Sequence, residues 1–241
     1  MKFIIIHYNT PKLTTALIAS LHKIGIYKDI VIFENSDKYP LNADEIFDDI
    51  FTYHNETGSI IDFNKEIHKF IEQNKISKAE ISKEEHGAKF GSLKHALTVQ
   101  WLLDNIDDDF FLLDSDILVK KDFRNLIDKG VLFTGETTQH RVLPFLIYFN
   151  INEIKNAGIK FCDFVNIHPN RRSLETDTGG SFLKECKNKH VIYRSITLSE
   201  YIEHYGSGSW RDPSINPNAF QGQYNRMSEM EFLRINKNLF I

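Results

Sequence analysis

One run of the sequence restricts the fold more than any other: Phe110–Asp116, which reads FFLLDSD. Apolar residues lead straight into two aspartates one residue apart, and apolar residues resume at Ile117. Such a run is typical of a strand buried on both faces of a sheet. Ionised carboxylates at its end are costly unless a partner such as a divalent cation satisfies them. The run therefore predicts a cation site at the carboxyl edge of an α/β sheet, where such sheets bind ligands. The alternative is a polar turn whose aspartates bind backbone amides.

The start of the chain alternates strand and helix. Phe3–Ile6 predicts a buried strand, and Ile30–Phe33 predicts a second one. Between them, Thr10 and Pro11 predict the start of a helix that ends at Gly25. A strand, a helix and a strand within about 35 residues form a βαβ unit, whose strands are parallel.

Later runs predict further elements of both kinds. The expected strands are Ile50–Tyr53, Val131–Gly135, Phe145–Phe149 and Val191–Tyr193, and the expected helices are Ile60–Ile71, a helix capped by Ser92 that reaches Leu102, Ile151–Ala157 and Ser181–Cys186. From Gly206 onward the Gly, Ser, Asn and Pro residues predict an irregular tail. At 241 residues, this pattern favours one compact α/β domain with a mostly parallel central sheet flanked by helices.

Charge and cysteine content exclude several classes of function. A net charge of −4 argues against a nucleic-acid partner. Two cysteines without a Cys-X-X-Cys motif indicate neither a disulfide framework nor a zinc ribbon, and they suit a reducing cytoplasm. No apolar run is long enough to cross a bilayer. We therefore expect a cytoplasmic protein, with peripheral contact to the inner face of a membrane left open.

A second chemistry-bearing segment lies far downstream, at Glu203–Trp210, which reads EHYGSGSW. Its glycines and serines let the backbone approach a ligand closely. His204, directly before this loop, is a candidate third ligand for the cation. The alternative is that His204 is a lone histidine at the surface or in the core.

Together these features resemble the GT-A-fold, nucleotide-sugar-dependent glycosyltransferases of the family-2-like bacterial group. The resemblance runs from Phe3 to about Trp210. It rests, in chain order, on the His7-Tyr8-Asn9 loop, the acidic strand end at Glu34, the helix with Ser92 and His95, the Asp-X-Asp motif Asp114-Ser115-Asp116, and His204–Trp210. It implies a single Rossmann-like GT-A domain over residues 1–241. Residues 1–119 would bind the nucleotide sugar, 120–205 would form the acceptor half, and 206–241 would be an irregular tail able to act as a lid.

The resemblance also implies roles for particular residues. Mn²⁺ or Mg²⁺ would be held by Asp114, Asp116 and His204. The donor would contact His7, Tyr8, Asn9, Glu34, His95, Asp114 and Ser115. Structural alternatives stand beside three of these roles: Tyr8 packing on a helix, Glu34 capping a turn, and His95 facing the core.

An inverting transfer also needs a carboxylate that deprotonates the acceptor hydroxyl. Asp177, in a loop before a helix, is the first candidate for this base, and the alternative is that it caps that helix. Glu136 and Asp212 are second choices. Members of the group often carry an adjacent acidic pair here, whereas Thr176 separates Glu175 from Asp177. A retaining enzyme needs no such base, so the stereochemistry stays open, with inversion slightly favoured.

The function predicted from the sequence is therefore a metal-dependent glycosyltransferase. It would move a sugar from a UDP- or GDP-type donor to a hydroxyl of a glycan or lipid-linked saccharide, in surface polysaccharide synthesis. One alternative is another nucleotide-sugar-processing enzyme, although the chain has no Walker loop and no Gly-X-Gly-X-X-Gly after its first strand. The other alternative is a non-catalytic carbohydrate- or nucleotide-binding protein of the same fold.

Overall fold

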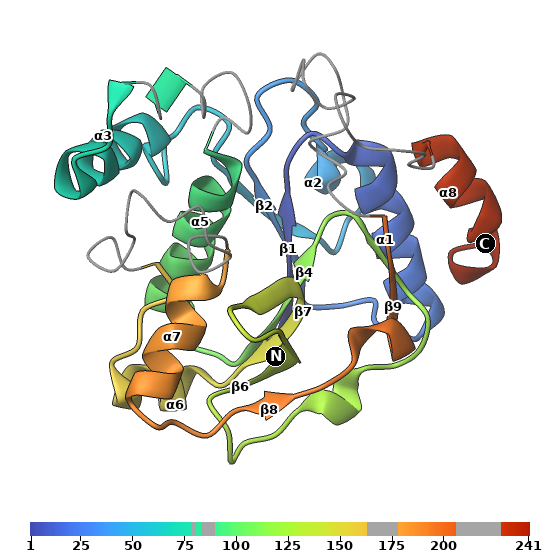
Figure 1. Cartoon of the computed structure of the whole chain (residues 1–241). Coiled ribbons are helices and arrows are strands. Elements are labelled where there is room, and N and C mark those ends of the chain that lie inside the picture. The colour runs from blue at the N-terminus through green and yellow to red at the C-terminus, as the bar shows by residue number, and fades with distance from the viewer. Residues whose placement is uncertain (79–80, 83–89, 163–177, 206–227) are drawn as a thin grey trace.

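The computed structural model describes residues 1–78, 81–82, 90–162, 178–205 and 228–241. Within these residues the centre is a seven-stranded sheet of order β3-β2-β1-β4-β7-β6-β8 (Figure 1). Its strands are β1 (Lys2–His7), β2 (Ile30–Glu34), β3 (Phe51–His54), β4 (Phe110–Asp114), β6 (Phe133–Thr137), β7 (Val142–Phe149) and β8 (Arg194–Ser195). Four of the six described strand pairs are parallel, while β7 runs antiparallel to both β4 and β6. The predicted α/β class with a mostly parallel sheet is confirmed.

The register of the parallel strands explains why the first apolar runs of the sequence are so uniform. β1 lies between β2 and β4, and its Ile5 is paired with Ile32 on one side and Leu113 on the other. All three side chains are fully buried. Central parallel strands are covered on both faces, so both sets of alternating residues must be apolar.

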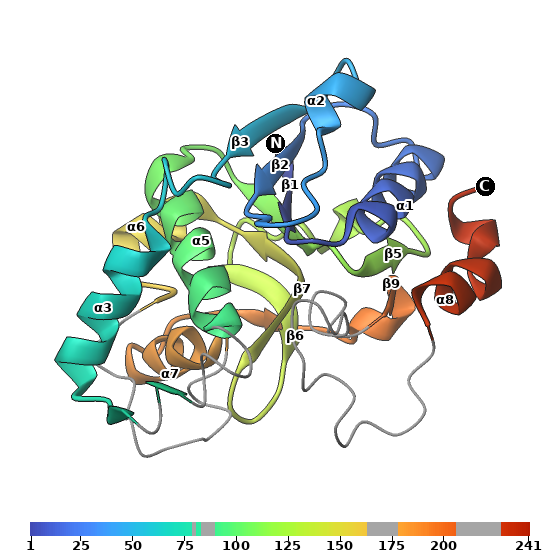
Figure 2. The ribbon, with the colours of Figure 1, turned by 90° about the horizontal axis from the view of Figure 1, so that it is seen from above.

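Helices cover both faces of the sheet (Figure 2). One face carries α3 (Phe63–Asn74), α5 (Gly91–Asn105), α6 (Ile151–Ala157) and α7 (Gly180–Asn188), and the other carries α1 (Pro11–Lys23), with α2 (Ala43–Ile46) at its upper end and α8 (Glu229–Ile235) outside α1. Side chains alternate along β1 accordingly: Ile4 and Ile6 pack under α5, whereas Phe3 and Ile5 pack under α1. Among the described helices none is both long and apolar enough to cross a bilayer.

A second, smaller sheet pairs β5 (Ile117–Val119) with β9 (Ile202–His204) in antiparallel fashion. The apolar run that resumes after the aspartates therefore leaves the central sheet. This small sheet packs against α1, on the same side of the molecule as α8 (Figure 2).

Three details differ from the sequence-based expectations. Helix α5 begins at Gly91 after Phe90, whose φ is 57°, so Ser92 lies inside the helix and is not its cap. The strand expected at Val191–Tyr193 is instead β8, Arg194–Ser195, which pairs with β6. Val191 and Tyr193 pack against the core just before this strand.

The expected irregular tail also ends in a helix. The Ser228 hydroxyl accepts a hydrogen bond from the Glu231 N–H at 3.2 Å and so caps α8. The pattern Ser-X-X-Glu is the sequence signature of such a helix start. The Gly-, Ser-, Asn- and Pro-rich composition before Ser228 hides this short signal in the sequence.

Candidate functional site

The two aspartates lie at the carboxyl edge of the sheet, where β4 ends. Asp114 is the last residue of β4 and is paired with Ile6 of β1. The Ser115 N–H donates to Asp114 Oδ1 at 2.9 Å, and the Thr10 hydroxyl donates to Ser115 Oγ at 2.8 Å. The motif is therefore tied to the start of α1. Because β1 has β2 on one side and β4 on the other, this is the point at which the strand order reverses, a usual ligand position in open α/β sheets.

The carboxylates of Asp114 and Asp116 repel each other. Burial, followed by the neighbouring charge of Asp116, raises the pKa of Asp114 to about 7, while His204 acts in the opposite direction. Asp116 is itself buried, with 5% of its surface exposed. Excess negative charge in a buried place is the situation that a bound cation relieves.

His204 reaches the aspartates through the small sheet. Its partner in the β5–β9 register is Ile117, the residue directly after Asp116. This register places His204 Nε2 at 3.2 Å from Asp116 Oδ1. The imidazole also lies against the Phe145 ring of β7, with 3.7 Å between ring centroids and 33° between ring planes. The structure thus brings Asp114, Asp116 and His204 together.

The donor atoms at this edge suit a divalent cation in kind. Carboxylate oxygens with one imidazole nitrogen are ligands that Mn²⁺ and Mg²⁺ accept. The pKa of Asp114 is raised first by burial and then by the charge of Asp116, and a bound cation would oppose both effects. Over the described part of the chain, however, no group of three or more His, Cys, Asp or Glu side chains is already arranged to hold a metal ion. The ligand types of Asp114, Asp116 and His204 therefore suit a divalent cation, but the three side chains are not arranged as a complete coordination site.

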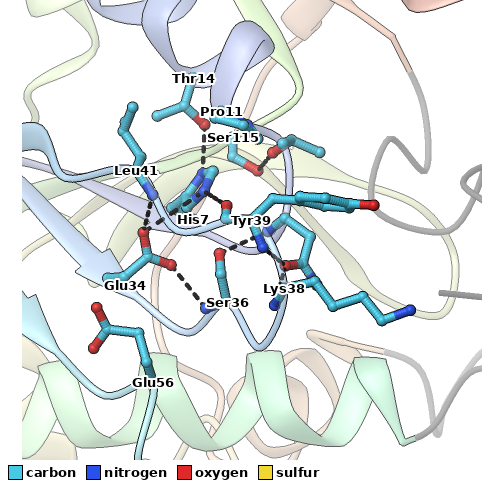
Figure 3. Close-up of polar contacts among 12 residues, drawn as sticks. His7, Pro11, Thr14, Glu34, Ser36, Lys38, Tyr39, Leu41, Glu56 and Ser115 are labelled. Carbon is cyan, nitrogen blue, oxygen red and sulfur yellow. Dashed lines mark hydrogen bonds and ion pairs between the residues drawn. The ribbon is translucent and has the colours of Figure 1, made fainter. Parts of the chain in front are cut away.

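Two of the predicted donor residues, His7 and Glu34, form a buried support beneath a loop (Figure 3). Both side chains are fully buried. Glu34 accepts hydrogen bonds from the N–H groups of Ser36 and Leu41, each at 2.7 Å. His7 Nε2 donates to the Tyr39 carbonyl oxygen at 3.2 Å. These contacts fix residues 35–41, so His7 and Glu34 shape the loop from inside and present no surface of their own.

The protonation state of His7 follows from its partners. Because Nε2 donates to a carbonyl, Nδ1 carries no proton. Nδ1 therefore accepts a hydrogen bond from the Thr14 hydroxyl, with 2.7 Å between Nδ1 and Oγ1. Burial lowers the pKa of His7 to about 4, so the ring is neutral at pH 7. Its 3.6 Å approach to Glu34 is then a polar contact and not an ion pair. Burial likewise raises the pKa of Glu34.

This depressed pKa predicts a loss of stability in mild acid. An unfolded chain protonates His7 as the pH falls below about 6.5, whereas the folded chain resists until about pH 4. Between these values the wild type should lose up to about 3 kcal/mol of unfolding free energy through this group. In His7→Gln, urea titrations at pH 7, 5.5 and 4.5 should show a flatter dependence of stability on pH. His68→Gln, an exposed position on α3, should follow the wild type. Equal slopes in His7→Gln and wild type would contradict the prediction.

Tyr8 and Asn9 directly follow β1 and contact the same loop. Asn9 adopts φ 57°, and its side-chain oxygen accepts from the N–H groups of Lys38 and Tyr39 at 3.0 and 2.9 Å. Tyr8 is half-buried beside Asp37, and burial followed by this carboxylate raises the Tyr8 pKa to about 12. The Lys94 ammonium of α5 lies 5.9 Å from the Tyr8 ring centroid. An aromatic face beside a cation therefore lies next to the carboxyl edge.

His95 approaches the aspartates from α5. Both of its ring nitrogens are shielded from solvent and have no hydrogen-bond partner in the described chain. Burial lowers the pKa of His95 to about 4, against the opposing influence of Asp116. His95 is thus a neutral imidazole within electrostatic reach of Asp116.

Of the three candidate bases, only Glu136 belongs to the part of the chain that the structure describes. Glu136, at the end of β6, accepts the Leu198 N–H at 2.7 Å and so holds the short 3₁₀ helix Leu198–Glu200 that leads into β9. Asp177 and Asp212 lie outside the residues that the structure describes, as does the Gly/Ser loop after Tyr205. The contact that sequence reasoning missed is Phe145 against His204, and no local pattern could have indicated it because the two residues lie on different strands of different sheets.

The strand order has one reversed strand beside β4 and the residues Asp-Ser-Asp where β4 ends, which is consistent with the GT-A-like α/β fold expected from the sequence. No family model and no curated protein matches the chain. Solved structures of glycosyltransferases are similar to it at low identity. GlyE of Streptococcus pneumoniae TIGR4 is 11% identical with a TM-score of 0.49, over 96% of this chain and 56% of that one.

Two further structures extend this comparison. The galactosyltransferase LgtC, in complex with donor and acceptor sugar analogues, is 11% identical with a TM-score of 0.40, over 68% of this chain and 61% of that one. Mouse xyloside xylosyltransferase 1 is 8% identical with a TM-score of 0.44, over 82% of this chain and 85% of that one. The chain thus spans less than two thirds of the length of GlyE and of LgtC.

Proposed function

We propose that this protein is a metal-dependent glycosyltransferase that moves a sugar from a nucleoside-diphosphate donor to a hydroxyl of a glycan or lipid-linked saccharide. The observation that carries the proposal is the pair of half-buried Asp114 and buried Asp116 at the carboxyl edge of the sheet, with His204 3.2 Å from Asp116. A pair of carboxylates at a strand-order reversal is suited to a diphosphate bound through a divalent cation.

In this proposal each described residue at the edge has a defined task. Asp114, Asp116 and His204 would hold Mn²⁺ or Mg²⁺. When bound, the cation supplies Lewis-acid stabilisation of the negative charge that forms on the leaving diphosphate. Tyr8 would present its ring to the nucleoside, and Lys94 beside it would add positive charge near the phosphates. The buried His7 and Glu34 would keep the nucleoside loop in one shape.

The proposal also covers the base and the acceptor of the reaction. If the transfer inverts the anomeric centre, a carboxylate must remove the acceptor proton, and Asp177 is the residue we propose for this step. Glu136 is a weaker choice than Asp177, because its carboxylate already accepts the Leu198 N–H. The acceptor we propose is a growing surface polysaccharide, reached from the cytoplasmic face of a membrane.

The first test is a thermal-shift experiment with UDP and GDP, each with and without Mn²⁺. A ligand at one hundred times its Kd adds about 2.7 kcal/mol to the native state. For a chain of this size, this corresponds to a rise in Tm of roughly 5–10 °C. We expect this rise with one of the two nucleotides only when Mn²⁺ is also present.

UMP and GMP with Mn²⁺ are the matched controls, because they keep the base and ribose but lack the diphosphate that the cation would bridge. A Tm that no diphosphate moves, with or without metal, would exclude the proposal. A Tm that rises with an oligosaccharide alone would instead indicate a carbohydrate-binding protein. With the active nucleotide known, a panel of its sugar conjugates and release of free diphosphate would identify the donor sugar.

A further inference from the structure

The small β5–β9 sheet decides whether Asp116 and His204 meet. Asp116 directly precedes β5, and His204 is the last residue of β9. Each strand has only three residues in the described chain. An isolated pair of strands this short is not stable in water, so packing from outside must hold it in place.

The two faces of this sheet pack against different partners. Ile117, Val119 and Ile202 join the core between the central sheet and α1. His204 lies on this side too, with its ring against Phe145. On the opposite side, Leu118 and Tyr205 join a separate cluster with Leu13 and Ala16 of α1 and Phe232 of α8.

Tyr205 connects this second cluster with the aspartate. Its backbone N–H donates to the Asp116 carbonyl oxygen at 2.9 Å, which extends the β5–β9 pairing by one bond. Its ring meets the Phe232 ring, with 5.1 Å between centroids and 51° between planes. Tyr205 also directly follows His204. A shift of Tyr205 would therefore move the backbone at both members of the Asp116–His204 pair.

Helix α8 is in turn fastened to α1, which it flanks in Figures 1 and 2. In the segment that follows α8, the carbonyl oxygens of Asn238 and Ile241 accept hydrogen bonds from the Lys23 ammonium at the end of α1, the latter at 2.7 Å. At the other end of α8, Lys12 Nζ lies 4.0 Å from Glu229 Oε1. A helix of seven residues has little stability of its own, so these contacts and Phe232 hold it in place.

We propose that α8 is a positioning element of the candidate site, with Phe232 as its anchor. Phe232 packs behind Tyr205 and thereby holds β9 against β5, which keeps His204 at Asp116. The importance of this arrangement for donor binding rests on the proposed function, whereas the positioning itself does not. In this proposal Phe232 is a positioning residue, which acts through the packing of Tyr205.

The test compares Phe232→Ala with two controls. Met230→Ala removes a similar volume from the same helix, at a side chain that is 67% exposed. Ile154→Ala lowers stability by truncating a buried residue of α6 in a different core cluster. Affinity for the active nucleotide diphosphate with Mn²⁺ is measured by calorimetry at a temperature at which circular dichroism shows each variant folded. Phe232→Ala should bind at least ten-fold more weakly than wild type, and both controls should stay within two-fold.

A second measurement follows His204 itself and needs no ligand. The Phe145 ring against His204 should shift the His204 Cε1–H proton resonance in NMR spectra, and this resonance can be assigned through its disappearance in His204→Gln. In Phe232→Ala it should move toward the value of a free histidine, while it should stay in place in Met230→Ala and Ile154→Ala. Phe232→Leu, which refills most of the space, should restore it.

The outcomes separate the two proposals. An unchanged His204 resonance in Phe232→Ala would overturn the positioning role, whatever the protein binds. Wild type that binds no nucleotide diphosphate with Mn²⁺, together with a shifted resonance in Phe232→Ala, would exclude the proposed function and leave the positioning role supported. Weaker nucleotide binding in Ile154→Ala to the same extent as in Phe232→Ala would reduce the effect to general destabilisation and overturn the inference.

Discussion

Asp116→Asn should abolish Mn²⁺-dependent nucleotide binding and lower kcat/KM by about a thousand-fold, equivalent to about 4 kcal/mol of transition-state stabilisation. The substitution keeps the size of the side chain and removes one of the two charges that would hold the cation. Calorimetry with UDP or GDP, in the presence and absence of Mn²⁺, measures the binding, and release of diphosphate measures turnover. Metal-dependent binding at wild-type strength would place the cation elsewhere.

The stability of the same variant provides an independent check. The charge of Asp116 contributes to the raised pKa of Asp114, so its removal should bring that pKa down toward the usual range for aspartate. A buried carboxyl with a raised pKa costs stability at neutral pH, and Asp116→Asn should relieve part of this cost. Without metal the variant should therefore be no less stable than wild type.

Asp107→Asn is the matched control for this experiment. Its side chain is 93% exposed and pairs with Lys155 at the opposite end of β4. We expect it to leave metal-dependent binding and turnover unchanged. A substantial loss of stability in metal-free Asp116→Asn would show that the main role of Asp116 is to stabilise the folded structure.

Gly179→Ala should be the most destabilising single-methyl change in the described chain. Gly179 precedes α7 with φ +83°, and a Cβ there would lie 2.3 Å from the Val142 carbonyl oxygen. Backbone strain and the clash together should lower the unfolding free energy by about 4 kcal/mol. The Val142 N–H also donates to the Gly179 carbonyl oxygen at 3.3 Å, so the edge of β7 should loosen as well.

Gly25→Ala isolates the backbone contribution to this effect. Gly25 ends α1 with φ +82°, but a Cβ there would meet no described atom within 4 Å. This variant should lose only about 1–2 kcal/mol. Urea unfolding of the two variants, side by side, measures the difference. Equal losses of unfolding free energy in the two variants would show that Val142 moves aside without an energetic penalty. The close approach of Val142 to Gly179 would then not be the reason for a glycine at this position.

The elements that the sequence predicted well are those whose signal is local. The apolar runs of β1, β2 and β4 came close to their observed bounds, because burial of central parallel strands imposes an uninterrupted pattern. Helix α1 also begins and ends close to its predicted bounds, but the Thr10 hydroxyl, expected to cap it, donates to Ser115 and makes no cap. The start of α5 was missed because a left-handed Phe90 precedes it, a backbone state that side-chain preferences at Ser92 do not reveal. The end of the chain was missed because a short capping box is easily outweighed by the composition before it.

The residues of the candidate site were also predictable only where they lie close together in the sequence. Asp114 and Asp116 were visible as a pair because they are nearly adjacent in sequence, and the strand before them placed them at a sheet edge. The approach of His204 to Asp116, the ring of Phe145 against it and the support of Tyr205 by Phe232 were not visible. Each of these contacts joins segments that are distant along the chain.

The sequence by itself determined the class of sheet, the position of the aspartates at its edge and the residue types that could accompany them. Only the tertiary structure decided that His7 and Glu34 support a loop from inside, that Glu136 holds a 3₁₀ helix, and that a three-residue strand carries His204 to Asp116. The physical reason is that side-chain patterns record whether a residue is buried, and burial follows from local periodicity. Which buried residues meet depends on strand register and helix docking, and both are set by the packing of the whole chain.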